Sequence, residues 1–183
     1  AEFARSLGSA EATARRYLYI LTSSFMVRQL PPWFENLGKR QVKASKLYIR
    51  DSGLLHALLN LNSFATLEGH SKLGASWEGF ALEQVLRLMG EGDAYFWATH
   101  SGAELDLLVF TKGKRYGFEF KYADAPRMTK SMHIALKDLR LWRIFVVYPG
   151  SISYPIHKKV EVVPVTELIA RLGSGSLSIP RGE

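Results

Sequence analysis

The strongest constraint on the fold is a run of three alternating segments, at residues 94–99, 104–110 and 116–122, separated only by short turns. Apolar and polar side chains alternate along them with a period of two, which predicts strands of one sheet. The turn Thr111-Lys112-Gly113-Lys114 is expected to join the second and third strands as a hairpin.

Helical periodicity flanks these strands. Residues 77–89 predict an amphipathic helix, with Trp77, Ala81 and Val85 on its buried stripe and Glu83 and Arg87 as an exposed pair. A helix over 132–139 and an apolar strand over 142–148 complete the order αβββαβ. We therefore expect an α/β fold with a mixed sheet flanked by helices. Residues 160–164 and 165–172 predict a last strand and a last helix.

A smaller α+β unit precedes this core. A helix that carries Arg15 and Arg16 is followed by a strand at 26–30, a basic loop at 36–45, a strand at 46–50 and a short helix at 54–61. This order is that of the back half of a winged helix. The expected organisation is a partial winged-helix-like unit over 1–60, the larger domain over 61–172 and a flexible tail over 173–183.

Composition excludes several classes of protein. The chain has 183 residues, 47% of them hydrophobic and 22% charged, which is typical of globular proteins. Its apolar runs are far shorter than the roughly 20 residues that cross a bilayer, so we expect no membrane partner. Cysteine is absent, which excludes thiolate metal sites and thiol nucleophiles and favours the reducing cytoplasm. The five histidines do not fall at metal-ligand spacing.

The positive charge is concentrated near the start of the chain. Residues 1–50 contain nine Lys and Arg against three Asp and Glu, and residues 51–183 contain fifteen against fourteen, which together give the net charge of +7. A basic patch favours contact with phosphate groups, and a solvated cationic surface explains the same count.

The residues that carry chemistry lie on the predicted hairpin. In the strand at 116–122, Glu119 and Lys121 share one face, and in the neighbouring strand Asp106 lies where it can approach Glu119. Two adjacent carboxylates repel each other unless a proton or a cation lies between them. Carboxylate oxygens are the ligands that Mg²⁺ or Mn²⁺ prefers, and a nearby lysine can orient the attacking water or neutralise charge on a phosphate.

Glu78 adds a third acid to this set. It lies on the predicted helix in line with Leu82 and Val85, where an unpaired carboxylate is costly. Taken alone, Glu119 and Lys121 are explained more simply by an ordinary salt pair at a sheet edge. The four residues together favour phosphodiester hydrolysis.

These residues resemble a known superfamily. Gly102-Ala103-Glu104-Leu105-Asp106, about a dozen further residues and Glu119-Phe120-Lys121 resemble the motifs of the PD-(D/E)xK nucleases, and Trp77-Glu78-Gly79-Phe80 resembles their first-helix acid. The resemblance implies a restriction-endonuclease-like core. It also implies that Asp106 and Glu119 bind the metal, that Lys121 assists the attacking water and that Glu78 supports the metal ligands. Leu105 replaces the proline of the family motif.

A second resemblance covers nearly the whole chain. Tyr17-Leu18, the segments 46–54 and 74–80, and Phe96-Trp97 ahead of 102–106 are similar to the C-terminal region of bacterial and archaeal AAA-type ATPases that carry a domain of unknown function. There, an ATPase module precedes a winged helix and a nuclease-like domain. This implies an ATPase partner within a longer parent chain. The Gly-x-x-x-x-Gly-Lys-Ser/Thr motif is absent from this sequence, so we expect no ATP site in it.

The leading functional hypothesis is therefore a Mg²⁺-dependent DNA phosphodiesterase or DNA-processing module. One alternative is a catalytically silent nuclease-like domain that serves DNA binding or the regulation of an ATPase, and another is defence or toxin–antitoxin regulation through DNA binding alone. The sequence also allows a homo-oligomer. The residues expected to contact DNA phosphates are Arg15, Arg16, Lys39, Arg40, Lys43 and Lys130.

Overall fold

The computed structural model describes residues 8, 10–35, 38 and 41–175 and has a mixed α/β architecture. Its elements, in chain order, are α2 (Glu11–Ser23), β1 (Val27–Leu30), β2 (Lys46–Ile49), α3 (Ser52–Leu58), α4 (Phe64–Glu68), α5 (Leu73–Met89), β3 (Ala94–Ala98), β4 (Glu104–Thr111), β5 (Lys114–Phe120), α6 (Lys130–Asp138), β6 (Arg143–Tyr148), β7 (Tyr154–His157), β8 (Val160–Pro164) and α7 (Val165–Gly173). The predicted order αβββαβ is confirmed as α5-β3-β4-β5-α6-β6.

A six-stranded sheet in the order β3-β4-β5-β6-β8-β7 organises the larger part of the molecule. The pairs β3–β4 and β4–β5 are antiparallel, as the short turns predicted. The pairs β5–β6 and β6–β8 are parallel, and β7 returns antiparallel to β8. The expectation of a mixed sheet is therefore confirmed, while β7 and the short helix α4 are additions that the sequence had not indicated.

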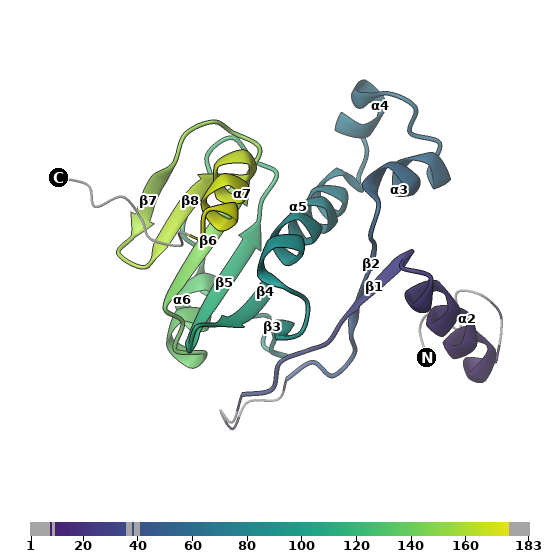
Figure 1. Ribbon diagram of the computed structural model, residues 1–183, viewed down its shortest axis with the longest axis horizontal. Helices are drawn as coiled ribbons and strands as arrows, with labels where there is room; N and C mark the ends of the chain where they lie inside the picture. Colours follow the sequence, from purple (N-terminus) through teal and green to yellow (C-terminus); the bar gives the residue numbers. More distant parts are fainter. Residues whose placement is uncertain (1–7, 9, 36–37, 39–40, 176–183) are drawn as a thin grey trace.

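Helices cover both faces of this sheet (Figure 1). Leu82 and Val85 of α5 pack in one buried cluster with Leu168 of α7, and Met132 and Ala135 of α6 pack in the cluster on the other side. The central strand β6 is buried on both sides from Ile144 to Tyr148, which explains its unbroken apolar sequence. Within the described ranges, no helix is long and apolar enough to cross a membrane.

The N-terminal unit is a helix followed by a two-stranded hairpin. Strands β1 and β2 pair antiparallel, with Val27 opposite Ile49 and Leu30 opposite Lys46. Between β1 and β2 the chain forms a hydrogen bond with β3, in which the Trp33 N–H donates to the Phe96 carbonyl at 2.7 Å. Helix α2 stands away from the large sheet (Figure 1), and its one buried residue is Ala14. The order helix, strand, loop, strand matches the sequence prediction.

Glu83 does not form the exposed pair with Arg87 that helical spacing predicted. It accepts hydrogen bonds instead from Arg28 of β1, with Nη2 at 2.9 Å, and from Arg50 just after β2, with Nε at 3.1 Å. Both arginines also reach Glu91. Tertiary pairing with arginines 55 and 33 positions away replaces the local pair, and it fixes the hairpin against α5.

Replacing Glu83 with Ala should therefore lower the free energy of unfolding by about 2–4 kcal/mol, since breaking a buried ion pair leaves its partner uncompensated. Arg28 is only 9% exposed and would keep Glu91 alone. Urea titration measures the change. Glu91→Ala is the matched control, and it should cost about 1 kcal/mol or less because Glu91 is half exposed. Equal losses in the two variants would contradict the assignment of Glu83 as the main anchor.

Candidate active site at the end of the sheet

Asp106 of β4 and Glu119 of β5 lie beside each other on neighbouring strands and are almost completely buried, at 5% and 4% exposed. The Asp106 Oδ2 atom accepts a hydrogen bond from the Phe120 N–H at 2.9 Å. The Glu119 Oε1 atom is buried and has no hydrogen-bond partner within the described structure. The predicted approach of these two acids across the hairpin is thus present.

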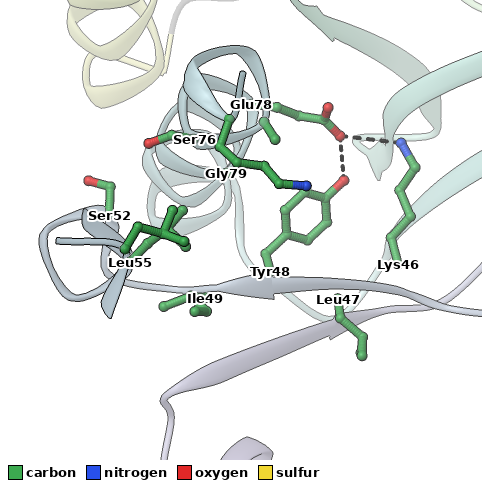
Figure 2. Close-up of a pocket in the computed structure, with 12 residues that line it drawn as sticks. Lys46, Leu47, Tyr48, Ile49, Ser52, Leu55, Ser76, Glu78 and Gly79 are labelled. Carbon is green, nitrogen blue, oxygen red and sulfur yellow. Dashed lines mark hydrogen bonds and ion pairs between the residues drawn. The ribbon is translucent and has the colours of Figure 1, made fainter. Parts of the chain in front are cut away.

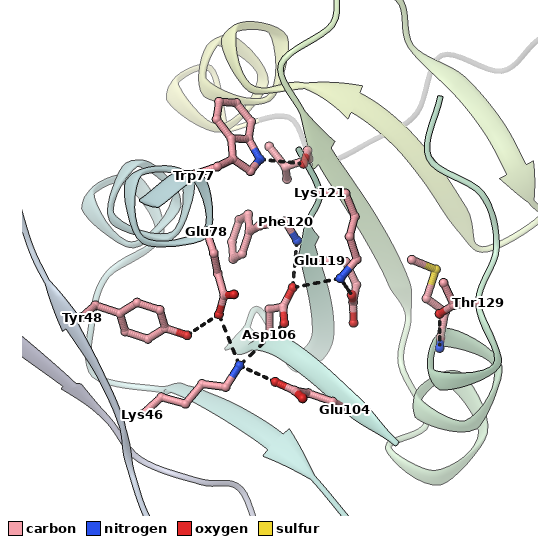
Figure 3. A network of polar contacts seen from close by, with 12 residues as sticks. Lys46, Tyr48, Trp77, Glu78, Glu104, Asp106, Glu119, Phe120, Lys121 and Thr129 are labelled. Atoms are coloured by element: carbon pink, nitrogen blue, oxygen red, sulfur yellow. Dashed lines mark hydrogen bonds and ion pairs between the residues drawn. The ribbon is translucent and has the colours of Figure 1, made fainter. Parts of the chain in front are cut away.

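Lys121, directly after β5, faces both acids (Figure 3). Its Nζ lies 2.8 Å from Glu119 Oε2 and 3.7 Å from Asp106 Oδ2. The backbone of this position is held by the Val147 carbonyl of β6, which accepts from the Lys121 N–H at 2.9 Å and from the Trp77 indole N–H at 3.4 Å. One carbonyl therefore links the end of β5 to the helix that carries Glu78.

Glu78 of α5 points toward the same cluster but is held by the N-terminal hairpin. Its Oε1 accepts from the Tyr48 hydroxyl at 2.6 Å and from the Lys46 Nζ at 3.2 Å. The structure thus brings together all four residues that the sequence singled out.

Lys46 is the site residue that sequence reasoning missed. Its Nζ pairs with Glu78, with Glu104 and, at 3.7 Å, with Asp106, so one ammonium group bridges α5 and β4. The alternation of Lys46, Tyr48 and Arg50 was visible in the strand at 46–50, but nothing local indicated what that face would meet. Glu104 shares the face of Asp106, as alternation suggested.

Burial and charge shift the acidity of these groups. Burial raises the pKa of Glu119 to about 8, and the negative charge of Asp106 adds to the shift. Burial also raises the pKa of Asp106, with a further contribution from Glu78. For Lys121, burial favours the neutral form, but the charges of Asp106 and Glu119 outweigh it and its pKa rises above the ordinary value. Lys121 is therefore an ammonium ion at neutral pH.

The same balance holds at Lys46. Desolvation opposes its charge, and the carboxylates of Glu78, Asp106 and Glu104 more than compensate, so the pKa of Lys46 is raised as well. Burial and the Glu78 carboxylate raise the pKa of the Tyr48 hydroxyl, which therefore remains a hydrogen-bond donor. Two cations and one neutral donor thus face the acids.

The fully ionised site would carry a net negative charge. When ionised, the carboxylates of Glu78, Glu104, Asp106 and Glu119 carry −4, and the two lysines carry +2, which leaves −2. In the described part of the chain, no three or more His, Asp or Glu residues form a ready-made metal cage. The residues fit a sparser kind of site, in which one or two carboxylates hold Mg²⁺ and water and phosphate supply the other ligands. The unpartnered Glu119 Oε1 is suited to that role.

A cavity of about 420 Å³ lies on the hairpin side of Glu78 (Figure 2). Its walls come from β2, α3 and the first turns of α5. Leu55, Leu59 and Ala75 supply apolar surface, and Lys46 and Glu78 line the cavity and also belong to the acid cluster.

The residues expected to contact DNA do not gather in one place. Arg15 and Arg16 lie exposed on α2, where Arg15 pairs with Glu11, and Lys130 begins α6. These helices lie at opposite sides of the molecule in Figure 1. Lys43 is exposed in the segment before β2, and Lys39 and Arg40 lie outside the described residues.

Two family models match the chain, each over a different part of it. The model described as Domain of unknown function (DUF8612) matches residues 1–65, and the one described as Domain of unknown function (DUF4143) matches residues 73–168, more than half of the chain. Lys46 and Tyr48 therefore come from the first segment and the four acids from the second.

Two relatives come from mycobacteria. Uncharacterized protein Rv2008c of Mycobacterium tuberculosis and Uncharacterized protein Mb2031c of Mycobacterium bovis are each 50% identical to the chain over 169 residues. The match covers 92% of this chain and 38% of each relative, so the chain spans well under half of their length. No solved structure matches it.

Proposed function

The chain belongs to the family described as Domain of unknown function (DUF4143), and we propose that it is a metal-dependent phosphodiesterase module that acts on DNA. The observation that carries the proposal is the buried pair Asp106 and Glu119, with an unpartnered carboxylate oxygen and Lys121 at 2.8 Å. A buried pair of carboxyl groups next to a fixed cation suits the binding of a divalent ion and of a phosphate group.

The element order supports this proposal. The sequence α5-β3-β4-β5-α6-β6, with the acids on β4 and β5, is the arrangement expected for a restriction-endonuclease-like core. The helix, strand, loop and strand ahead of it are consistent with a partial winged helix. The proposed unit boundaries are those of the sequence prediction, 1–60 and 61–172.

Asp106 and Glu119 would hold Mg²⁺ or Mn²⁺. Such an ion polarises a phosphoryl oxygen and stabilises the charge of the transition state when it is bound. Lys121, held as an ammonium ion by its two acidic neighbours, neutralises charge that builds on the phosphate and orients the attacking water. Glu78 has a positioning role, because it holds Tyr48 and Lys46 at the edge of the cluster.

DNA binding is part of the same proposal. Arg15, Arg16 and Lys43 are exposed, and Lys130 lies at the first turn of α6, whose first backbone N–H groups favour anions. An AAA-type ATPase module is the proposed partner within a longer chain, which the greater length of the mycobacterial relatives accommodates.

Incubation of supercoiled and branched DNA with the protein in Mg²⁺, in Mn²⁺ and in EDTA tests the activity. We expect wild-type protein to nick or cut DNA only when a divalent ion is present, and we expect Asp106→Asn to be inactive. Calorimetric titration with Mn²⁺ tests the metal site without assuming a DNA substrate. Intact DNA in every condition, together with no heat of Mn²⁺ binding, would support the alternative of a catalytically silent domain.

A further inference from the structure

We propose that Lys46 is an intramolecular counter-ion that takes the place of a divalent cation at the acid cluster, so that the N-terminal hairpin regulates metal binding. The inference rests on the proposed function, since it concerns the same acids. It adds a group within the chain that competes with the metal ion for the acids, and it assigns a role to the segment that precedes the six-stranded sheet.

The geometry of Lys46 is unlike that of an ordinary surface ion pair. Its Nζ lies 3.2 Å from Glu78 Oε1 and 3.7 Å from Asp106 Oδ1, and it also contacts Glu104. Three carboxylates from two elements thus converge on one ammonium group (Figure 3). The Asp106 carboxylate, which faces this ammonium group, is also a proposed ligand of the divalent ion, and carboxylate oxygens suit a hard metal cation.

Lys46 and Lys121 approach Asp106 from different elements. Lys121 pairs with the Oδ2 atom and Lys46 with the Oδ1 atom. An incoming cation at Asp106 would be repelled by both ammonium groups. Lys121 belongs to the proposed chemistry, whereas Lys46 comes from the segment matched by a different family model.

The neighbouring cavity offers space for a second conformation of the Lys46 side chain. The cavity of about 420 Å³ is lined by Lys46 and by Glu78, one of the acids that Lys46 pairs with (Figure 2). A lysine stem has several rotatable bonds and can follow apolar walls while its head stays solvated. Lys46 can therefore withdraw from the acids by a change of rotamer, while the ion pairs of Arg28 and Arg50 with Glu83 keep β1 and β2 in place.

The test is a calorimetric titration of Mn²⁺ into four folded proteins: wild type, Lys46→Met, Lys158→Met and Asp106→Asn. Lys158 is the matched control, because it lies exposed in the turn between β7 and β8, beyond the opposite end of the parallel strands. We expect Lys46→Met to bind Mn²⁺ about tenfold more tightly than wild type, since one repelling charge near the ion is lost. Lys158→Met should match wild type, and Asp106→Asn should not bind.

The other outcomes separate the two proposals. If wild type binds Mn²⁺ and Asp106→Asn does not, but Lys46→Met binds no more tightly than wild type, the counter-ion role of Lys46 is wrong and the metal site stands. If no protein binds Mn²⁺, or Asp106→Asn binds as well as wild type, the metal site itself is wrong and the counter-ion role fails with it.

A second variant guards against loss of folding. Lys46→Gln keeps a polar side chain beside the acids and removes the charge, so it should show the same gain in affinity. Thermal melts of the variants with and without Mn²⁺ provide an independent measurement. The rise in melting temperature on adding Mn²⁺ should be larger for either Lys46 variant than for wild type, and an equal rise would contradict the proposal.

Discussion

Replacing Lys121 with Met is expected to lower the rate of Mn²⁺-dependent DNA cleavage by about 10²–10⁴-fold while the protein still binds Mn²⁺. The reason is the position of the Lys121 ammonium group, which pairs with both Asp106 and Glu119. Its loss would remove the positive charge that we propose faces the phosphate, and the carboxylates of Asp106 and Glu119 would still be able to hold the proposed ion. Mn²⁺ affinity should stay the same or rise.

Single-turnover cleavage of a labelled DNA, measured with saturating Mn²⁺, separates this effect from binding. Lys158→Met is again the control for a lost positive charge, and Asp106→Asn is the control for a lost metal site. A Lys121→Met protein that cuts at the wild-type rate would show that the lysine has a purely structural role. A variant that loses Mn²⁺ binding would show that Lys121 acts on the metal site and not on the phosphate.

The approach of Asp106 and Glu119 was predictable because it depends on local rules. A period of two places Glu119 and Lys121 on one face, and a short turn forces the strand with Asp106 to pair beside them. Each rule acts over a few residues, and the order of the core elements from α5 to β6 follows from the same rules. Periodicity and turn chemistry were sufficient for this part of the structure.

The surroundings of these acids were not predictable in the same way. Lys46 is separated from Asp106 by sixty positions, and its contact depends on how the hairpin docks on α5. Glu83 shows the same limit, because helical spacing offered Arg87 as a partner and the folded chain supplied Arg28 and Arg50. The partners of long side chains depend on how the helices and strands pack together, and local periodicity does not indicate that packing.

The second large effect is a dependence of stability on pH in the absence of metal. Burial gives Glu119 a pKa of about 8 in the folded protein, against about 4.5 for an exposed glutamate. Between these values the folded state holds a proton that the unfolded chain has released. The contribution of this group to stability is therefore complete below pH 4.5 and is lost as the pH rises to about 8.

Each pKa unit corresponds to about 1.4 kcal/mol, so the loss attributable to Glu119 is on the order of 5 kcal/mol. Glu119→Gln cannot ionise and should be more stable than wild type at pH 8 and similar to it at pH 4.5. A smaller slope should remain in the variant, because the pKa of Asp106 is raised too. Urea titrations across this pH range measure the difference, with Glu68→Gln, an exposed carboxylate on α4, as the control.

Mn²⁺ connects this stability effect to the proposed site. The bound ion would supply positive charge that compensates the ionised carboxylates. An Mn²⁺ concentration about 100-fold above the dissociation constant should therefore stabilise the wild-type protein at pH 8 by about 2.7 kcal/mol. Glu119→Gln should gain much less, since one of the two proposed ligands is gone. Wild-type stability that is flat or rises between pH 5 and 8 would contradict the raised pKa of Glu119. An equal gain from Mn²⁺ in both proteins would place the ion away from Glu119.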